Sequence, residues 1–207
     1  MPMTLSKGLT AVILLLFPMM ASAQISLPSD VAAWTPAAGD RVLVDTEDSI
    51  VHLVHENGQF ISLNGLTGQH RNVYAVGRYY YAATPTKNWI VTSVEEKGPS
   101  VTFGAGRFLR LFEVNNDGST ERTAYGMHSH RSFDTMLNDK IQKTAFDRAG
   151  KGYRSLGCVL LSEKDLTIVA DTLAANGGTL SVQTAPGLTP PPVEIADANT
   201  PPSWFGW

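Results

Sequence analysis

The fold class is decided by residues 49–63, which read Ser49-Ile50-Val51-His52-Leu53-Val54-His55-Glu56-Asn57-Gly58-Gln59-Phe60-Ile61-Ser62-Leu63. Two runs rich in β-branched and aromatic residues flank Asn57-Gly58, a dipeptide that favours a tight hairpin turn. In the first run, Ile50, His52 and Val54 alternate onto one face, as in a strand. A further β-rich run, Arg41–Asp45, precedes it after an acidic turn. The pattern predicts antiparallel strands from residue 41 onward.

The same kind of pattern continues through the middle of the chain. Tyrosine-rich residues 73–83 read as one strand, which ends at Thr84-Pro85 because proline cannot continue a central ladder. Further strands are expected over Trp89–Val94, Arg107–Val114 and Glu121–Met127. The region therefore predicts a β-rich, mainly antiparallel sheet system.

Helical spacing of apolar residues begins after this β-rich region. A first helix is expected over Phe133–Ala149, with Ser132 as its N-cap and Gly150 as its stop. Its apolar positions are Phe133, Met136, Leu137, Ile141 and Ala145.

A second helix is expected after a short extended run, Val159–Leu161. Ser162 is its N-cap, and Gly177-Gly178 ends it. Its apolar stripe consists of Leu166, Val169 and Leu173, and Leu180–Thr184 follows as a last strand. The predicted fold class is therefore mainly β, with a β-rich mixed sheet and two helices.

The first 23 residues have the pattern of a secretory signal peptide. Lys7 supplies a positive charge, Leu9–Met20 is apolar, and Ala21-Ser22-Ala23 is a small-residue cleavage site. We expect cleavage after Ala23, export to the periplasm, and no stable membrane span afterwards. An uncleaved N-terminal anchor is the alternative.

The remaining sequence divides by composition into three parts. Residues 24–40 form a lead-in rich in Pro, Ala and Ser, residues 41–185 form one folded domain, and residues 186–207 form a Pro-rich C-terminal tail. The aromatic end of the tail, Trp204–Trp207, either packs on the domain or binds a partner.

Several function classes have no support in the sequence. The net charge is −3 and no basic block is present, so nucleic acid is not an expected partner. The chain lacks CxxC, HExxH, Walker and GxGxxG motifs, so neither a metal nor a cofactor is expected.

One cysteine, Cys158, stands in the stretch Tyr153-Arg154-Ser155-Leu156-Gly157-Cys158-Val159. A single cysteine in an exported chain cannot form an internal disulfide. The thiol is then buried and inert, paired with another chain, or reactive.

A reactive cysteine needs a base and donors for an oxyanion. His128 and His130 lie upstream on one face of the expected strand end, and either could be the base. The N–H groups of Gly157 and Cys158 are candidate oxyanion donors. The remaining histidines, His52, His55 and His70, are expected to be structural or solvent-facing.

Two neighbours of the cysteine have open roles. Ser155 could hydrogen-bond the turn or the imidazole. Arg154 is either a cation that favours the thiolate or a solvated surface arginine.

These residues carry a family resemblance. Tyr125-Gly126-Met127-His128-Ser129, followed by Ser155-Leu156-Gly157-Cys158-Val159, resembles the signature of the L,D-transpeptidase catalytic domain, the YkuD-like family. Thr84-Pro85 resembles the Thr-Pro turn of that family. The resemblance implies a YkuD-like β-sandwich, with one helix inserted between base and nucleophile and one after the catalytic cysteine.

The resemblance also implies roles for the matched residues. Cys158 would be the acylated nucleophile and His128 the base. Ser129 would act through its backbone, and Ser155 would be a motif serine. Tyr125 belongs to the matched strand, and His130, which has no counterpart in the motif, is a second candidate for base or substrate contact. Leu160 departs from the family pattern, which has Arg or Asn at that position.

The implied activity is acyl transfer on peptidoglycan. The cysteine would attack a stem peptide at the L-centre of diaminopimelate, D-Ala would leave, and an amine of a neighbouring stem would resolve the thioester. If water attacks instead, the protein is an L,D-carboxypeptidase. If the acceptor is an outer-membrane lipoprotein, the enzyme is an anchoring or releasing variant. A module that binds peptidoglycan without turnover is the non-enzymatic alternative.

Overall fold

The structure, a computed structural model, describes residues 34–143 and 147–191. The expected signal peptide with its cleavage site, most of the lead-in, and the tail beyond residue 191 lie outside the described residues. So does Ala145, which was expected on the first helix.

One sheet of nine strands forms the body of the molecule. Its strand order is β12-β10-β9-β7-β13-β1-β2-β3, and β8 pairs with β9. The strands are β1 (Arg41–Asp45), β2 (Ile50–Val54), β3 (Phe60–Asn64), β7 (Lys87–Val91), β8 (Val94–Glu96), β9 (Arg107–Val114), β10 (Thr120–His128), β12 (Val159–Leu160) and β13 (Leu180–Ala185).

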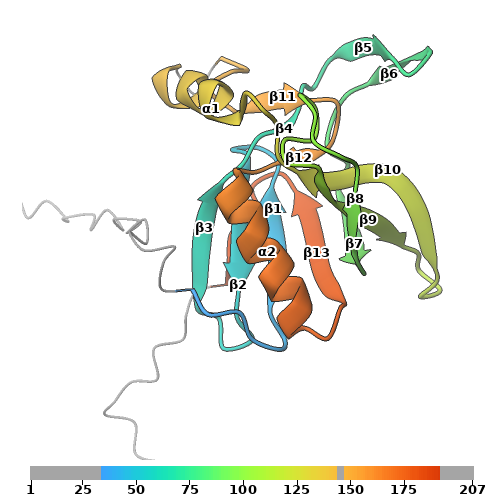
Figure 1. Cartoon of the computed structure of the whole chain (residues 1–207), viewed down its shortest axis with the longest axis vertical. Helices are drawn as coiled ribbons and strands as arrows, with labels where there is room; N and C mark the ends of the chain where they lie inside the picture. Colours follow the sequence, from blue (N-terminus) through green and yellow to red (C-terminus); the bar gives the residue numbers. More distant parts are fainter. Residues whose placement is uncertain (1–33, 144–146, 192–207) are drawn as a thin grey trace, which may run out of the picture.

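The sheet is mixed and curled. β1 pairs with β13 and β10 with β12 in parallel, whereas the other neighbours are antiparallel. The predicted Asn-Gly hairpin is confirmed, because β2 and β3 pair with Val54 opposite Phe60. The predicted mainly β class, with a mixed sheet and two helices, is confirmed (Figure 1).

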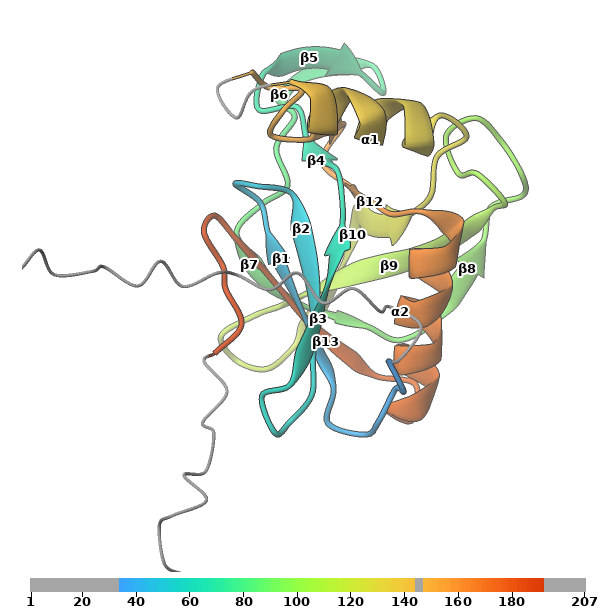
Figure 2. The ribbon, with the colours of Figure 1, turned by 90° about the vertical axis from the view of Figure 1, so that its left-hand side faces the viewer.

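Helix α2 (Glu163–Ala175) covers one face of the sheet (Figures 1 and 2). Its predicted stripe of Leu166, Val169 and Leu173 is buried and joins a core cluster to which eight of the described strands contribute. The Ser162 side chain accepts a hydrogen bond from Asp165 N–H, so Ser162 caps the helix as predicted. Burial of this stripe fixes the start of α2 against the sheet.

A second group of elements sits beyond one end of the sheet (Figure 2). Strands β4 (Thr67–Gly68) and β11 (Tyr153–Ser155) pair in parallel, and β5 (Asn72–Ala75) pairs with β6 (Arg78–Tyr81). Helix α1 (Phe133–Gln142) lies beside them.

The single tyrosine-rich strand predicted over residues 73–83 is wrong. The segment is a two-stranded ribbon, β5–β6, that reverses at Val76 and Gly77, whose φ angles are 51° and 77°. Two successive residues with positive φ form the tight turn that suits the twist of a hairpin. The turn could not be predicted at its first position, because valine, unlike glycine or asparagine, rarely adopts a positive φ.

The strand predicted over residues 89–94 is likewise divided. β7 ends at Val91 and β8 begins at Val94, and both pair with β9.

The predicted bounds of the first helix also need correction. α1 ends at Gln142, and Ser132 forms no side-chain cap. Instead, Ser132 N–H donates to His130 Nδ1 at 3.0 Å. Ile141 was expected on the apolar stripe but is exposed. Phe133 is the one residue of this helix that is buried. Neither helix of the described ranges is long and apolar enough to cross a membrane.

Candidate active site

Cys158 and His128 lie at the ends of neighbouring strands and line one cavity of about 760 Å³. β10 and β12 are parallel, and His128 pairs with Leu160. Since side chains alternate along a strand, Cys158, two residues before Leu160, faces the same side as His128. The sheet therefore brings together two residues that are far apart in the sequence.

His128 is buried and held in one tautomer. Its Nδ1 lies 2.7 Å from the carbonyl oxygen of Ser129, which only accepts, so Nδ1 carries the proton. Nε2 is then the unprotonated nitrogen of the neutral ring, and its lone pair can accept a proton. Burial lowers the pKa of His128, although the backbone bond to Ser129 opposes this shift. A second backbone contact, with Thr102, also favours the protonated ring and acts to raise the pKa of His128. A neutral imidazole with an Nε2 lone pair is the form that a general base requires.

Two aromatic rings pack against the imidazole. The ring of Phe108 stacks on His128 at a centroid distance of 5.6 Å, and Phe103 meets it edge-on at 5.1 Å. Both aromatic residues line the cavity. They fix the plane of the ring from two sides.

His130 has the opposite hydrogen-bonding role. Its Nδ1 accepts the Ser132 N–H, so Nδ1 is unprotonated and the proton of the neutral ring is on Nε2. His130 lines the same cavity but is set to donate rather than accept. Of the two histidines that the sequence offered as a base, only His128 has the matching tautomer.

The thiol of Cys158 is in its neutral form at rest. Burial raises the pKa of Cys158 to about 11, and a backbone hydrogen bond with Gly126 and the charge of Arg110 reduce this shift only in part. Within the described residues, no hydrogen bond joins the Cys158 sulfur to His128. Hydrogen bonds of this kind are often long without a ligand and tighten when one binds.

Arg110, and not Arg154, is the cation that acts on the thiol. Arg110 is 5% exposed, and its Nε and Nη2 donate to the two oxygens of Glu95 at 2.5 and 2.7 Å. Arg154 instead pairs with Asp139 of α1 at 2.8 Å, although it also lines the cavity. Around Arg110 the sequence predicts only a strand, and that pattern is the same whether an arginine side chain faces a cleft or solvent.

The loop before Cys158 is held by its own serine. Ser155 Oγ donates to Cys158 O at 2.5 Å and accepts the Gly157 N–H at 3.0 Å. In this conformation the Gly157 N–H already has an acceptor, so its predicted role as an oxyanion donor would require this bond to be exchanged. The N–H of Cys158 remains the candidate donor.

Gly157 is required for a steric reason. Its φ is 125°, and a Cβ at this position would lie 2.6 Å from the ring of Tyr125. Tyr125 lines the cavity beside the loop. On the far side, Tyr80 of the β5–β6 ribbon donates its hydroxyl to Leu156 O at 3.2 Å. The cysteine loop is thus enclosed by a tyrosine from the sheet and one from the ribbon.

Leu160 is a packing residue. It is 3% exposed and clusters with Leu66 and Phe133, against which Cys158 also packs. The chain therefore has no polar side chain at the position where the resembled family has Arg or Asn.

The cavity wall is apolar and cationic. Four cations line it, and none of the lining residues in the described ranges is an Asp or Glu. The cations are Arg78, Lys97, Arg110 and Arg154. Such a wall suits a ligand with apolar segments and carboxylates.

The other three histidines lie elsewhere. His52 bonds Ser62, His55 bonds Asp40, and His70 stacks on Tyr153, and none of these histidines lines the cavity. Within residues 34–143 and 147–191, no group of three or more His, Cys, Asp and Glu side chains is placed to hold a metal ion.

The chain matches no protein-family model, and no curated protein matches it. Among solved structures, it is similar to the crystal structure of the L,D-transpeptidase (residues 123–326) from Xylanimonas cellulosilytica, with 20% sequence identity and a TM-score of 0.47. The match covers 74% of this chain and 66% of that one.

Proposed function

We propose that this protein is a cysteine-dependent L,D-transpeptidase that acts on peptidoglycan stem peptides through a thioester. The observation that carries the proposal is the pairing of roles in one cavity. Cys158 is the sole thiol of the chain, and His128 faces the same cavity with Nδ1 protonated and Nε2 able to accept a proton. The sequence resemblance around His128 and Cys158 supports the same chemistry.

The first half-reaction follows from these roles. The sulfur of Cys158 forms a bond to the carbonyl carbon at the L-centre of diaminopimelate, and its proton passes to His128 Nε2. The developing oxyanion accepts the Cys158 N–H. The bond to the D-Ala nitrogen then breaks, and that nitrogen takes the proton from His128, which leaves a thioester on Cys158.

The second half-reaction regenerates the thiol. An acceptor amine attacks the thioester carbon and gives its proton to His128, and the sulfur leaves and recovers that proton. Water in place of the amine gives hydrolysis by the same residues. Transfer and hydrolysis therefore differ only in the nucleophile that reaches the thioester.

The cavity wall supports a stem peptide as substrate. Stem peptides carry carboxylates, and four cations line the wall. Arg110 and Lys97 pair with Glu95, and Arg154 pairs with Asp139, so within the described residues Arg78 is the lining cation without an ion pair. Charge complementarity favours entry of an anionic peptide and disfavours a cationic one.

One observation favours a second candidate, a peptidoglycan-binding module without turnover. The pKa of Cys158 is raised to about 11, so the resting thiol is a weak nucleophile unless His128 removes its proton. Measured reactivity of the thiol decides between the two candidates.

The test is incubation with a carbapenem followed by intact-mass measurement. We expect a single adduct that is absent in Cys158→Ala and forms about 100-fold more slowly in His128→Ala. His130→Ala, which removes the neighbouring ring, is the matched comparison and should retain most of the rate. An unmodified wild-type protein that is demonstrably folded would favour the non-enzymatic module.

Digestion of purified muropeptides then separates the two reactions of the thioester. Cross-linked dimers indicate transfer, and shortened monomers without dimers indicate an L,D-carboxypeptidase. Intact stems throughout would contradict both.

Export belongs to the same proposal, because peptidoglycan lies outside the cytoplasmic membrane. Protein released from the periplasm by osmotic shock should begin at Gln24 when its mass is measured. A full-length mass in the membrane fraction would indicate the uncleaved anchor instead.

A further inference from the structure

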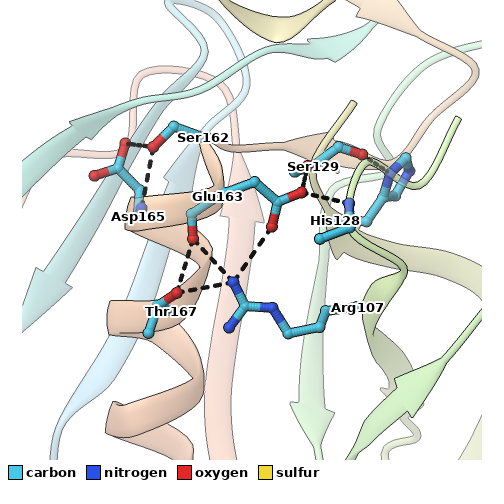
Figure 3. Close-up of polar contacts among 8 residues, drawn as sticks. Arg107, His128, Ser129, Ser162, Glu163, Asp165 and Thr167 are labelled. Atoms are coloured by element: carbon cyan, nitrogen blue, oxygen red, sulfur yellow. Dashed lines mark hydrogen bonds and ion pairs between the residues drawn. The ribbon is translucent and has the colours of Figure 1, made fainter. Parts of the chain in front are cut away.

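The first residue of α2 contacts the residue that follows the proposed base. Ser129 is 1% exposed, and its hydroxyl donates to Oε1 of Glu163 (Figure 3). The neighbouring acid of the same helical turn, Asp165, bonds Ser162, the N-cap, and no other side chain in the described part of the chain. The two acids of this turn therefore have different partners: Asp165 bonds the helix cap, and Glu163 bonds the residue next to the proposed base.

The same carboxylate holds the loop that covers the imidazole. Ala105 N–H donates to Glu163 Oε1 at 2.6 Å. At Gly104, whose φ is 55°, an added Cβ would overlap the Ser129 hydroxyl and the Glu163 carboxylate. The loop backbone thus lies directly against this pair, with no room for a side chain between them.

Arg107 fixes Glu163 from the other side. Its Nη2 donates to the backbone oxygen of Glu163 at 3.1 Å, to Thr167 Oγ1 at 2.8 Å and to Glu163 Oε2 at 3.3 Å (Figure 3). Burial opposes ionisation of Glu163, but the hydrogen bonds from Ser129, Ala105 and Arg107 together hold the pKa of this carboxyl below its usual value. Glu163, held by Arg107, is therefore a fixed acceptor for two further donors, Ser129 and Ala105.

Both donors belong to segments that orient His128. Ser129 supplies the carbonyl that accepts His128 Nδ1–H. The loop that contains Ala105 also carries Phe103, whose ring meets the imidazole edge-on. A movement of either segment changes the direction of the Nε2 lone pair.

We propose that Glu163 is a positioning residue for the base, acting through Ser129 and through the loop that carries Phe103. The inference rests on the proposed function, in which His128 accepts the thiol proton. Glu163 acts here as a hydrogen-bond acceptor, and its charge is not what the base requires.

This distinction gives a sharp set of variants. Glu163→Gln keeps an oxygen for Ser129 and Ala105 and leaves the two bonds from Arg107 to the backbone and to Thr167, but it replaces the 3.3 Å hydrogen bond by a contact between two donors, the Gln amide nitrogen and Arg107 Nη2. Glu163→Ala removes the acceptor. Asp165→Ala is the matched control, since it removes an acid from the same helical turn without touching Ser129.

Carbapenem acylation rates are the first readout. We expect a fall of about 10- to 100-fold in Glu163→Ala, because small displacements of a catalytic group cost about this much. Glu163→Gln and Asp165→Ala should stay within about threefold of wild type. Glu163→Ala and Ser129→Ala should combine less than additively, because they remove the two ends of one contact.

The second readout is the tautomer of His128, measured from the nitrogen chemical shifts of its ring. Wild type and Glu163→Gln should show Nδ1–H alone, and Glu163→Ala should show a mixture. A mere loss of helix stability would not change the tautomer, and Asp165→Ala reports that loss separately. An unchanged tautomer and acylation rate in Glu163→Ala would overturn the inference.

The two proposals fail in different ways. If wild-type protein is never acylated, the proposed function fails, but the tautomer comparison still tests the role of Glu163. If wild type is acylated and Glu163→Gln is as slow as Glu163→Ala, charge and not hydrogen-bond acceptance is what matters, and the inference is wrong as stated.

Discussion

The two helices that flank the site are attached in different ways. Helix α2 buries four side chains and begins at a serine that caps it. Helix α1 buries one, Phe133, and has no side-chain cap. α2 is thus part of the core, whereas α1 is joined to the body by few contacts. Segments with few buried contacts are the ones that open most easily.

The two walls of the cavity differ in the same way. The residues proposed for chemistry, Cys158 and His128, stand at strand ends of the large sheet. Two other lining residues, Met136 of α1 and Tyr80 of the ribbon, lie outside that sheet. The proposed reacting groups are therefore held by the sheet, whereas Met136 and Tyr80 line the cavity from elements outside it. Control of ligand access by α1 and the ribbon is a hypothesis that the variants below test.

The largest expected effect is on the unfolding free energy, and it tests whether α2 contributes more than α1 to the core. Leu166→Ala removes a fully buried side chain and should cost about 2–5 kcal/mol of unfolding free energy. Met136→Ala on α1, where the side chain is only partly buried, should cost less than about 1.5 kcal/mol. Urea unfolding measures both, and equal losses would remove the contrast between the helices.

The next effect is a pH dependence of stability that comes from Lys140, which hydrogen-bonds α1 to the body of the molecule. Lys140 donates to Ser49 O at 2.9 Å and Gly65 O at 3.3 Å, and burial lowers its pKa to about 8 despite Asp48 and Asp45 nearby. Between about pH 8 and 10.5 the unfolded chain therefore binds a proton that the folded protein does not.

The sign of the pH dependence follows from this difference. Since the unfolded state binds more protons, the Lys140 contribution makes the unfolding free energy rise with pH over that window. The expected rise over the whole window is on the order of 3 kcal/mol. It should be absent in Lys140→Met, and subtracting the two unfolding curves removes the titrations that both proteins share, including that of Cys158. Parallel curves would show that Lys140 titrates normally.

Capping provides a smaller contrast between the same helices. Ser162→Ala should cost about 1 kcal/mol, because it removes the acceptor for Asp165 N–H. Ser132→Ala should change the unfolding free energy by less than about 0.5 kcal/mol, since its side chain caps nothing. A large loss in Ser132→Ala would mean that α1 is capped in solution after all.

The smallest expected effect concerns the ribbon. Tyr80→Phe removes an exposed hydrogen bond to Leu156 O and should alter the unfolding free energy by about 0.5 kcal/mol or less. If the ribbon controls access, the same variant should still change the concentration dependence of carbapenem acylation. An unchanged dependence would confine control of access to α1.

The hairpin shows how local signals fixed part of the fold. Asn57-Gly58 sets the turn and β-branched residues set the strands, so β2 and β3 lie where the pattern places them. Val76-Gly77 shows the limit, since a valine with positive φ gives no such signal and the ribbon was read as one strand. Ser132 was expected to cap α1, but the His130 ring accepts its N–H instead.

Some residues of the candidate site could likewise be identified from the sequence, and others only from the structure. Sequence alone identified the sole cysteine, the histidine pair and the glycine before the thiol, because nucleophilic chemistry restricts which residue types can serve. Only the tertiary structure chose between His128 and His130, because the tautomer of each ring depends on what its Nδ1 meets in space. Arg110 and Glu163 reach the site from β9 and α2, and such contacts between distant segments leave no periodic trace in the chain.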